Sequence, residues 1–119
     1  MELLMLWYPK CSTCQKAKKW LDEHNVPYTL RHIAEDNPSS QELGQWQEKS
    51  GLPLKKFFNT SGLVYKELEL KTKLPAMALE EQLALLASNG MLVKRPILVG
   101  ESKALVGFKE KEWAEGLGV

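Results

Sequence analysis

Two cysteines, Cys11 and Cys14, are the residues of this sequence whose type and spacing point most directly to chemistry. The thiolate form of cysteine is a nucleophile that attacks disulfides and other oxidised groups. A second cysteine three positions later lies one helical turn away, so its sulfur can reach the first and resolve a mixed disulfide. The pair therefore predicts a redox-active centre in which Cys11 attacks and Cys14 closes a reversible disulfide bond.

The place of this pair along the chain adds a physical reason for its reactivity. An apolar run at residues 3–7 indicates a buried strand, and residues 12–25 have the periodicity of an amphipathic helix. Cys11 then lies at the start of the helix, where unpaired N–H groups and a partial positive charge favour a thiolate and lower its pKa. The neighbouring Lys10 and Lys16 are expected to add a positive field.

A zinc half-site and a pair of inert buried thiols are the alternatives to redox use. Structural zinc takes four ligands. The other soft candidates, His24 and His32, do not have the spacing of a zinc finger. Inert thiols fit poorly with a position between a strand and a helix. We therefore predict thiol chemistry with no metal and no bound cofactor.

Four segments have strand patterns bounded by turn residues, and they lie at residues 3–7, 28–33, 96–100 and 104–107. The first two, with the helix between them, form a strand–helix–strand unit, which has parallel strands and a right-handed crossover. The last two have the spacing of a β-hairpin, and a short helix at residues 110–117 follows them.

The middle of the chain has helical patterns. Ser39 and Glu42 have the spacing of a capping box at the start of a helix. Residues 63–70 are expected to be helical. An amphipathic helix is predicted at residues 79–88, with Gly90 as its C-terminal glycine.

Together these elements predict an α/β fold of the thioredoxin-like (glutaredoxin-like) class, with a four-stranded mixed sheet and a helical insertion. We expect one domain over residues 1–119. Its thioredoxin-like core covers about residues 1–33 and 92–119, and the insertion covers about residues 34–91.

Arg95-Pro96 is the second feature with chemical meaning. Proline is allowed at the first residue of a strand. In thioredoxin-like folds a cis proline at this place faces the C-x-x-C motif and shapes its pocket. Arg95 then directs a forked donor at an anion near Cys11. With the hydroxyl groups of Ser12 and Thr13, Arg95 and Pro96 form the predicted anion- or substrate-binding site.

Length and charge exclude several classes of protein. A chain of 119 residues suits one domain, and 16 basic against 15 acidic residues give a net charge of +1. Direct DNA binding needs a basic field, so we do not expect it. No apolar run approaches the roughly 20 residues of a membrane span. Met1–Trp7 is too short for a signal peptide and carries Glu2 where a basic residue belongs. We therefore expect a cytoplasmic protein with a transient disulfide.

Four stretches of the sequence, in order and spread along the chain, resemble the arsenate reductase–related (ArsC-like) family and, more narrowly, its Spx/MgsR-like branch. They are residues 8–17, 56–62, 94–97 and 106–108. The resemblance implies a thioredoxin-like fold with a helical insertion. It also implies that Cys11 is the reactive cysteine and that Arg95 is the arginine before the proline.

The resemblance implies two kinds of partner. Thioredoxin, or glutaredoxin with glutathione, is the expected reductant of a thiol–disulfide redox protein. Spx-like regulators instead bind the C-terminal domain of the RNA polymerase α subunit, with C-x-x-C as a redox switch. A redox-sensing transcriptional regulator is therefore the alternative function.

Glutaredoxin-coupled arsenate reduction is a further alternative. Reductases of this family hold their oxyanion with three arginines, whereas this chain contains only Arg31 and Arg95. Asn59 stands where the loop arginine is expected, and the segment after Gly107 offers Lys109 instead of an arginine. Lysine supplies charge without a bidentate fork, so this pattern disfavours efficient arsenate reduction.

Overall fold

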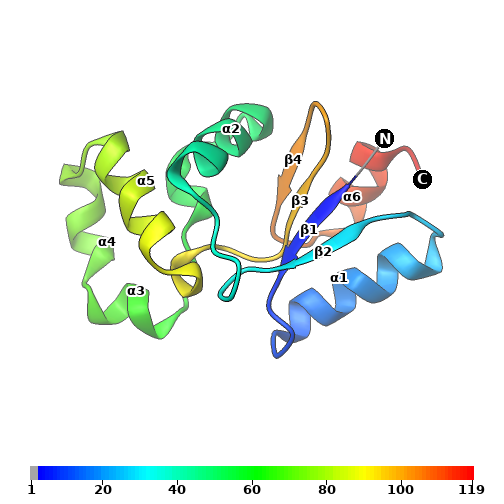
Figure 1. Cartoon of the computed structure of the whole chain (residues 1–119), viewed down its shortest axis with the longest axis horizontal. Helices are drawn as coiled ribbons and strands as arrows, with labels where there is room; N and C mark the ends of the chain where they lie inside the picture. Colours follow the sequence, from blue (N-terminus) through cyan, green and yellow to red (C-terminus); the bar gives the residue numbers. More distant parts are fainter. Residues whose placement is uncertain (1–2) are drawn as a thin grey trace.

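The computed structural model describes residues 3–119 and has the predicted four-stranded mixed sheet, in the order β2-β1-β3-β4 (Figure 1). The strands are β1 (Leu4–Trp7), β2 (Thr29–His32), β3 (Ile97–Val99) and β4 (Ala104–Val106). β1 pairs in parallel with β2 and antiparallel with β3, and β3 and β4 form the predicted hairpin. The expectation that concerned Glu2 lies outside the described residues.

The helices fall before, within and after the long segment between β2 and β3. They are α1 (Ser12–Glu23), α2 (Ser40–Ser50), α3 (Leu63–Glu67), α4 (Leu70–Lys73), α5 (Leu79–Ser88) and α6 (Glu110–Leu117). Short 3-10 helices are η1 (Leu54–Phe57), η2 (Leu74–Ala76) and η3 (Gly90–Leu92). Between residues 3 and 119 no helix is long and apolar enough to cross a membrane.

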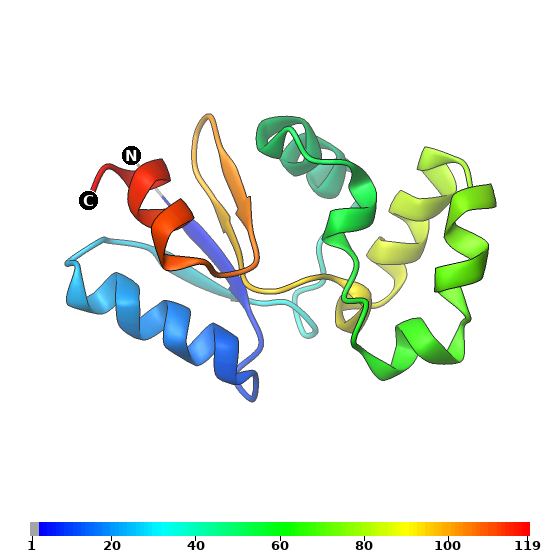
Figure 2. The ribbon, with the colours of Figure 1, turned by 180° about the vertical axis from the view of Figure 1, so that it is seen from behind.

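Helices cover both faces of the sheet, which explains why β1 is apolar at every position. Met5 packs with Ala17 of α1 and Trp113 of α6, and all three side chains are fully buried. Leu6 points to the opposite face and packs with α2 and the segment that follows it. Figures 1 and 2 accordingly place α1 and α6 on one side of the sheet and α2 to α5 on the other.

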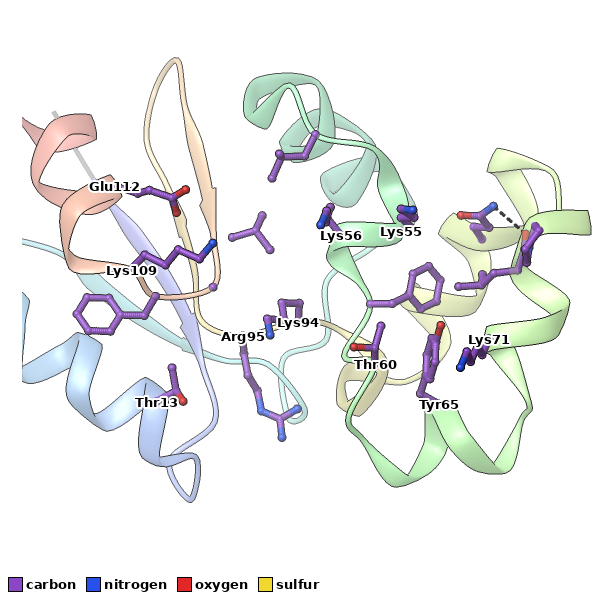
Figure 3. Close-up of a pocket in the computed structure, with 18 residues that line it drawn as sticks. Thr13, Lys55, Lys56, Thr60, Tyr65, Lys71, Lys94, Arg95, Lys109 and Glu112 are labelled. Carbon is purple, nitrogen blue, oxygen red and sulfur yellow. Dashed lines mark hydrogen bonds between the residues drawn. The ribbon is translucent and has the colours of Figure 1, made fainter.

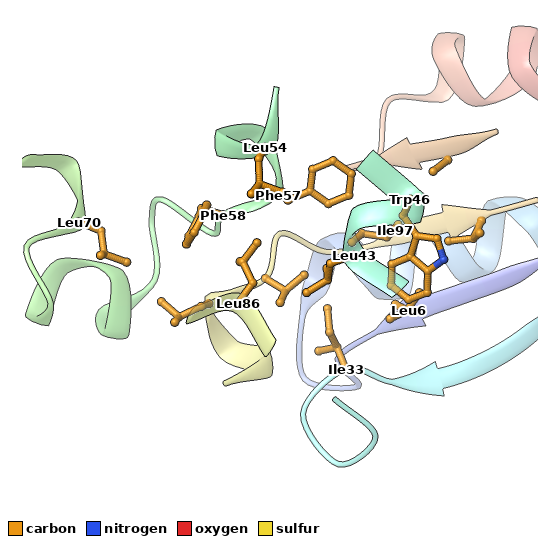
Figure 4. Close-up of a cluster of buried hydrophobic side chains, with 14 of the residues drawn as sticks. Leu6, Ile33, Leu43, Trp46, Leu54, Phe57, Phe58, Leu70, Leu86 and Ile97 are labelled. Carbon is orange, nitrogen blue, oxygen red and sulfur yellow. The ribbon is translucent and has the colours of Figure 1, made fainter. Parts of the chain in front are cut away.

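A single buried cluster joins the sheet to the helical segment (Figure 4). Leu6 and Ile97 contribute from the strands, and Trp46, Phe57 and Leu86 contribute from the helical segment. These side chains are at most 5% exposed. The helical segment is therefore fixed to the sheet by shared apolar burial, which keeps its residues in defined positions near the C-x-x-C motif.

Polar contacts fix the start of α2 to the end of β2. Ser39 and Glu42 form the predicted capping box. Arg31 also donates two hydrogen bonds to the Glu42 carboxylate, at 2.6 and 2.9 Å. Hydrogen bonds from Arg31 lower the pKa of Glu42 to about 2. Arg31 therefore has a structural partner in Glu42.

Three details of the helical segment differ from the sequence-based predictions. Residues 63–70 do not form one helix: α3 ends at Glu67, Glu69 breaks the chain with a φ of 54°, and α4 begins at Leu70. Leu79 is 53% exposed, so the apolar side of α5 starts later than its sequence indicates. Gly90 does not end α5, which is capped by Asn89; Gly90 begins η3 instead.

Close packing explains the glycine at position 90. A Cβ atom there lies 2.0 Å from the carbonyl oxygen of Ile33, a backbone atom that cannot move aside cheaply. We expect Gly90→Ala to lower the free energy of unfolding by about 3 kcal/mol, the upper range for overpacking. The matched control is Gly44→Ala in α2, where the nearest atom is 3.9 Å away. Helix propensity predicts that this control stabilises the protein by about 1 kcal/mol. Urea denaturation measures both variants, and equal effects contradict the packing argument.

Candidate functional site

The loop between β1 and α1 places Cys11 at the N-cap of α1, as predicted. Its backbone N–H donates to the carbonyl oxygen of Tyr8 at 2.9 Å, and its carbonyl oxygen accepts from the N–H of Gln15 at 3.0 Å. The Gln15 side chain closes the loop by donating to the carbonyl oxygen of Pro9 at 2.7 Å. These bonds hold the loop with the first-turn N–H groups of α1 around the Cys11 sulfur.

The two thiols lie in different surroundings. Cys11 is half-buried, whereas Cys14 is fully buried in the cluster between α1, α6 and the sheet. Burial raises the pKa of Cys11. Hydrogen bonds from the backbone N–H and thiol of Cys14, together with the charge of Arg95, outweigh burial, and the pKa of Cys11 is lowered.

The pKa of Cys14 moves in the opposite direction. Burial is the main cause, and the hydrogen bond and negative charge of Cys11 add to it, which raises the pKa of Cys14 to about 12. The arrangement therefore favours loss of the proton from the accessible Cys11 before the buried Cys14 behind it.

Arg95 lies above Tyr8 and precedes a cis peptide bond to Pro96. Its Cζ atom is 5.1 Å from the centre of the Tyr8 ring, a cation–π distance. Nε and Nη1 of Arg95 are covered and have no hydrogen-bond partner within residues 3–119. The positive charge of Arg95 lowers the pKa of Cys11. The uncommitted donors leave it able to bind an anion.

Two distant segments hold the backbone around Arg95 in place. On one side, Phe58 forms an antiparallel bridge with Val93, and the N–H of Lys94 donates to the carbonyl oxygen of Phe57 at 2.7 Å. On the other side, the N–H of Gly107 donates to the carbonyl oxygen of Pro96 at 2.8 Å. The helical segment and the C-terminal hairpin thus position Arg95 and Pro96 together.

A cleft of about 970 Å³ opens beside the cysteine motif, between the helical segment and the sheet side of the chain (Figure 3). Its walls include Thr13 and Arg95, so two of the predicted site residues share it, although Cys11 itself is not among its lining residues. The basic residues in its walls are Lys55, Lys56, Lys71, Lys94, Arg95 and Lys109. Glu112 is the one acidic residue among those that line it.

The remaining candidates from the sequence lie apart from the sulfur or have other contacts. Ser12 and Thr13 are exposed. His24 stacks on Trp20 with ring centres 4.1 Å apart. The Nδ1 atom of His32 accepts from two backbone N–H groups of the following turn. Within residues 3–119 no group of three or more metal-ligating side chains is present.

Sequence reasoning missed two contributors to this region. Tyr8 directly precedes the motif, but its contact with Arg95 depends on where β1 ends. The lysines of the cleft are scattered from position 55 to position 109, so their convergence appears only in the folded chain. The single local signal was Lys109, which stands where the family resemblance leads one to expect an anion-binding residue.

Comparison with known proteins agrees with the fold. Residues 6–116 match the sequence profile of the ArsC family. The chain is 58% identical over 115 residues to YusI of Bacillus subtilis, which covers 97% of this chain and 98% of YusI. It is 31% identical over 104 residues to the global transcriptional regulator Spx of Staphylococcus saprophyticus, covering 87% of this chain and 78% of Spx.

A crystal structure of an ArsC family related protein from Bacteroides fragilis has 63% sequence identity and a TM-score of 0.94, with 97% of each chain covered. The similarity therefore extends over the whole architecture, including the helical segment between β2 and β3.

The surroundings of Cys11 predict a pH-dependent reactivity that depends on Arg95. We expect the rate of iodoacetamide alkylation at Cys11 to rise with pH and level off below the pKa of roughly 8.5 of a free cysteine. Arg95→Gln removes the positive charge, so it raises that midpoint and slows alkylation at pH 7 by about fivefold. Lys10→Gln is the matched control, because the charge that lowers the pKa of Cys11 belongs to Arg95. A midpoint that is unchanged in Arg95→Gln contradicts this assignment.

Proposed function

The chain belongs to the ArsC family, and we propose that it is a thiol–disulfide oxidoreductase with Cys11 as its nucleophile. The observation that supports this best is the asymmetry of the two thiols. One is accessible with a lowered pKa, and its neighbour is buried with a raised pKa. An attacking thiolate followed by a protonated resolving thiol is the arrangement that two-step exchange requires.

In the first step the Cys11 thiolate attacks one sulfur of the substrate disulfide, and the other half leaves as a thiolate. The charge of Arg95 stabilises the negative charge on the reacting sulfurs, and Pro96 borders the pocket. Ser12 and Thr13 offer hydroxyl donors at its edge. Once Cys11 is in a mixed disulfide, it no longer carries the negative charge that raises the pKa of Cys14.

In the second step Cys14 loses its proton to the departing thiolate or to water and attacks the Cys11 sulfur. The second half of the substrate leaves, and a Cys11–Cys14 disulfide remains. Thioredoxin, or glutaredoxin with glutathione, then returns this disulfide to two thiols. We place the cycle in the cytoplasm, where these reductants keep thiols reduced.

Arsenate is a less favoured substrate for the same nucleophile. Arg95 is the only arginine beside Cys11, because Arg31 is bound to Glu42. Lys109 lines the cleft, but lysine is a point charge and does not fix a single oxyanion as a planar guanidinium does. Disulfide substrates do not need that three-armed oxyanion site.

A redox-sensing regulator is the second candidate, and the similarity to Spx is the observation that favours it. On this proposal the Cys11–Cys14 disulfide changes a surface that docks on the C-terminal domain of the RNA polymerase α subunit. We expect that domain, immobilised, to retain the oxidised and the reduced chain to different extents. Cys11→Ser is the control, because it cannot form the disulfide and is retained equally with and without oxidant. Absence of binding in both redox states removes this candidate.

Replacement of each cysteine separates the two steps of the proposed exchange. With hydroxyethyl disulfide as a neutral substrate, we expect Cys14→Ser to stop after the first attack and accumulate a mixed disulfide on Cys11. Cys11→Ser forms no adduct and loses essentially all turnover, because the remaining thiol is buried and protonated. Intact-mass spectrometry detects the adduct, and a coupled thioredoxin or glutaredoxin assay measures turnover. Full activity in both variants refutes the proposal.

A further inference from the structure

The cleft beside the cysteine motif has a local excess of positive charge. The whole sequence has 16 basic and 15 acidic residues. The cleft beside the cysteine motif instead combines six basic residues with one carboxylate, that of Glu112. A concave surface lined by one sign of charge attracts and concentrates ions of the opposite sign. The cleft therefore has the electrostatics of a site for a multiply charged anion.

The basic side chains of the cleft take part in no ion pair within the described residues. The lysine and arginine ion pairs within residues 3–119 lie elsewhere, at Lys18–Asp22, Arg31 with Asp36 and Glu42, and Lys73–Glu69. None of them involves a cleft residue. Two covered nitrogens of Arg95 also lack a hydrogen-bond partner. Gathering these charges without partners is unfavourable in the free protein, and a bound anion relieves the repulsion.

The charges stand on both walls of the cleft. Lys56 and Lys71 come from the helical segment, and Lys94 and Lys109 come from the approach to β3 and the start of α6 (Figure 3). Several anionic groups on one ligand are needed to meet cations on facing walls. The volume of about 970 Å³ lies at the upper end of the roughly 300–1,000 Å³ typical of small-molecule sites.

Aromatic side chains lie among these charges. Tyr65 and Phe108 line the same cleft, and both are partly exposed, so each offers apolar ring surface. A ligand that combines phosphate groups with a planar base matches both kinds of wall, since lysine binds phosphate as a point charge. An extended acidic peptide matches the charges but has no counterpart for the aromatic faces.

Arg95 connects this cleft to the sulfur chemistry. It lines the cleft, and its charge acts on Cys11. Thr13, two residues after Cys11, lines the cleft as well. Arg95 and Thr13 thus mark the end of the cleft toward which a ligand anchored at the lysines would extend its reacting group.

We propose that the cleft binds a small-molecule disulfide whose thiol halves carry several phosphate groups on a nucleotide-type carrier. The reaction of this ligand rests on the proposed function, whereas its binding does not. The Cys11 thiolate attacks the disulfide, which releases one carrier thiolate and leaves the other half bonded to Cys11. Cys14 then gives up its proton and displaces the second carrier thiolate. The products are two carrier thiols and the Cys11–Cys14 disulfide, so the protein dithiol is the reductant.

A pair of probes with the same reacting arm tests this proposal. Coenzyme A disulfide carries phosphates and a base, whereas pantethine has the same disulfide arm without them. In a single turnover with the reduced full-length chain, we expect coenzyme A disulfide to oxidise the cysteine pair about tenfold faster than pantethine, a modest electrostatic enhancement. Raising the ionic strength is expected to remove most of that preference, because salt screens exposed charges.

Lysine variants locate the preference in the cleft. We expect Lys109→Gln and Lys56→Gln each to lower the ratio of the two rates by about threefold, as for loss of one exposed ion pair. Lys111→Gln is the matched control, because Lys111 lies on α6 two residues after Lys109 but does not line the cleft. The ratio is expected to stay unchanged in this control.

The outcomes separate this proposal from the proposed function. Equal rates for the two probes overturn the phosphate site while leaving thiol exchange intact. A still faster reaction with an aspartate-rich disulfide peptide overturns it in favour of an acidic polypeptide. If Cys11 reacts with neither probe, the proposed function fails. Calorimetric titration of Cys11→Ser with coenzyme A then tests binding in the cleft independently of the thiol chemistry. Binding that weakens in Lys109→Gln but not in Lys111→Gln supports the site, and absence of binding overturns it.

Discussion

A negative charge on a half-buried sulfur is the constraint on which the rest of this site depends. Burial alone keeps a cysteine protonated, so the Cys11 thiolate requires fixed donors and a positive charge that are in place before it reacts. The N-terminus of α1 supplies the N–H of Cys14, and Arg95 supplies the charge. Because these groups come from opposite ends of the sequence, the sheet must bring them together.

The sheet does this by pairing β1 with β3, so that the ends of the two strands carry the cysteine loop and the Arg95-Pro96 segment side by side. The helical segment between β2 and β3 then gains a positioning role besides its own burial. Its bridge from Phe58 to Val93 fixes the approach to β3, and the shared apolar cluster fixes the bridge. A change in the packing of this segment is therefore transmitted to Arg95 through the backbone.

Local features of this structure could be predicted from the sequence, and convergent ones could not. The C-x-x-C motif at a helix start, the capping box of Ser39 and Glu42 and the hairpin depend on neighbouring residues, so their patterns are visible in the sequence. The close approach of Gly90 to Ile33 and the cation–π contact of Arg95 with Tyr8 each join residues far apart in the chain. The family resemblance pointed to Arg95, but it gave no indication that five lysines gather beside it.

The cleft has one arginine close to Cys11 and five lysines farther away, and these two kinds of cation suit different tasks. Close to Cys11 the chain has an arginine, whose planar group lies over Tyr8 and whose flanking backbone is held by hydrogen bonds of Lys94 and Pro96. Farther along the cleft it uses lysines, whose flexible stems let each charge follow its own anionic group. An oxyanion held directly at Cys11 needs bidentate guanidinium donors close to the sulfur. A long anionic ligand needs charge spread along its path, and the arrangement of one arginine followed by lysines fits the second requirement better than the first.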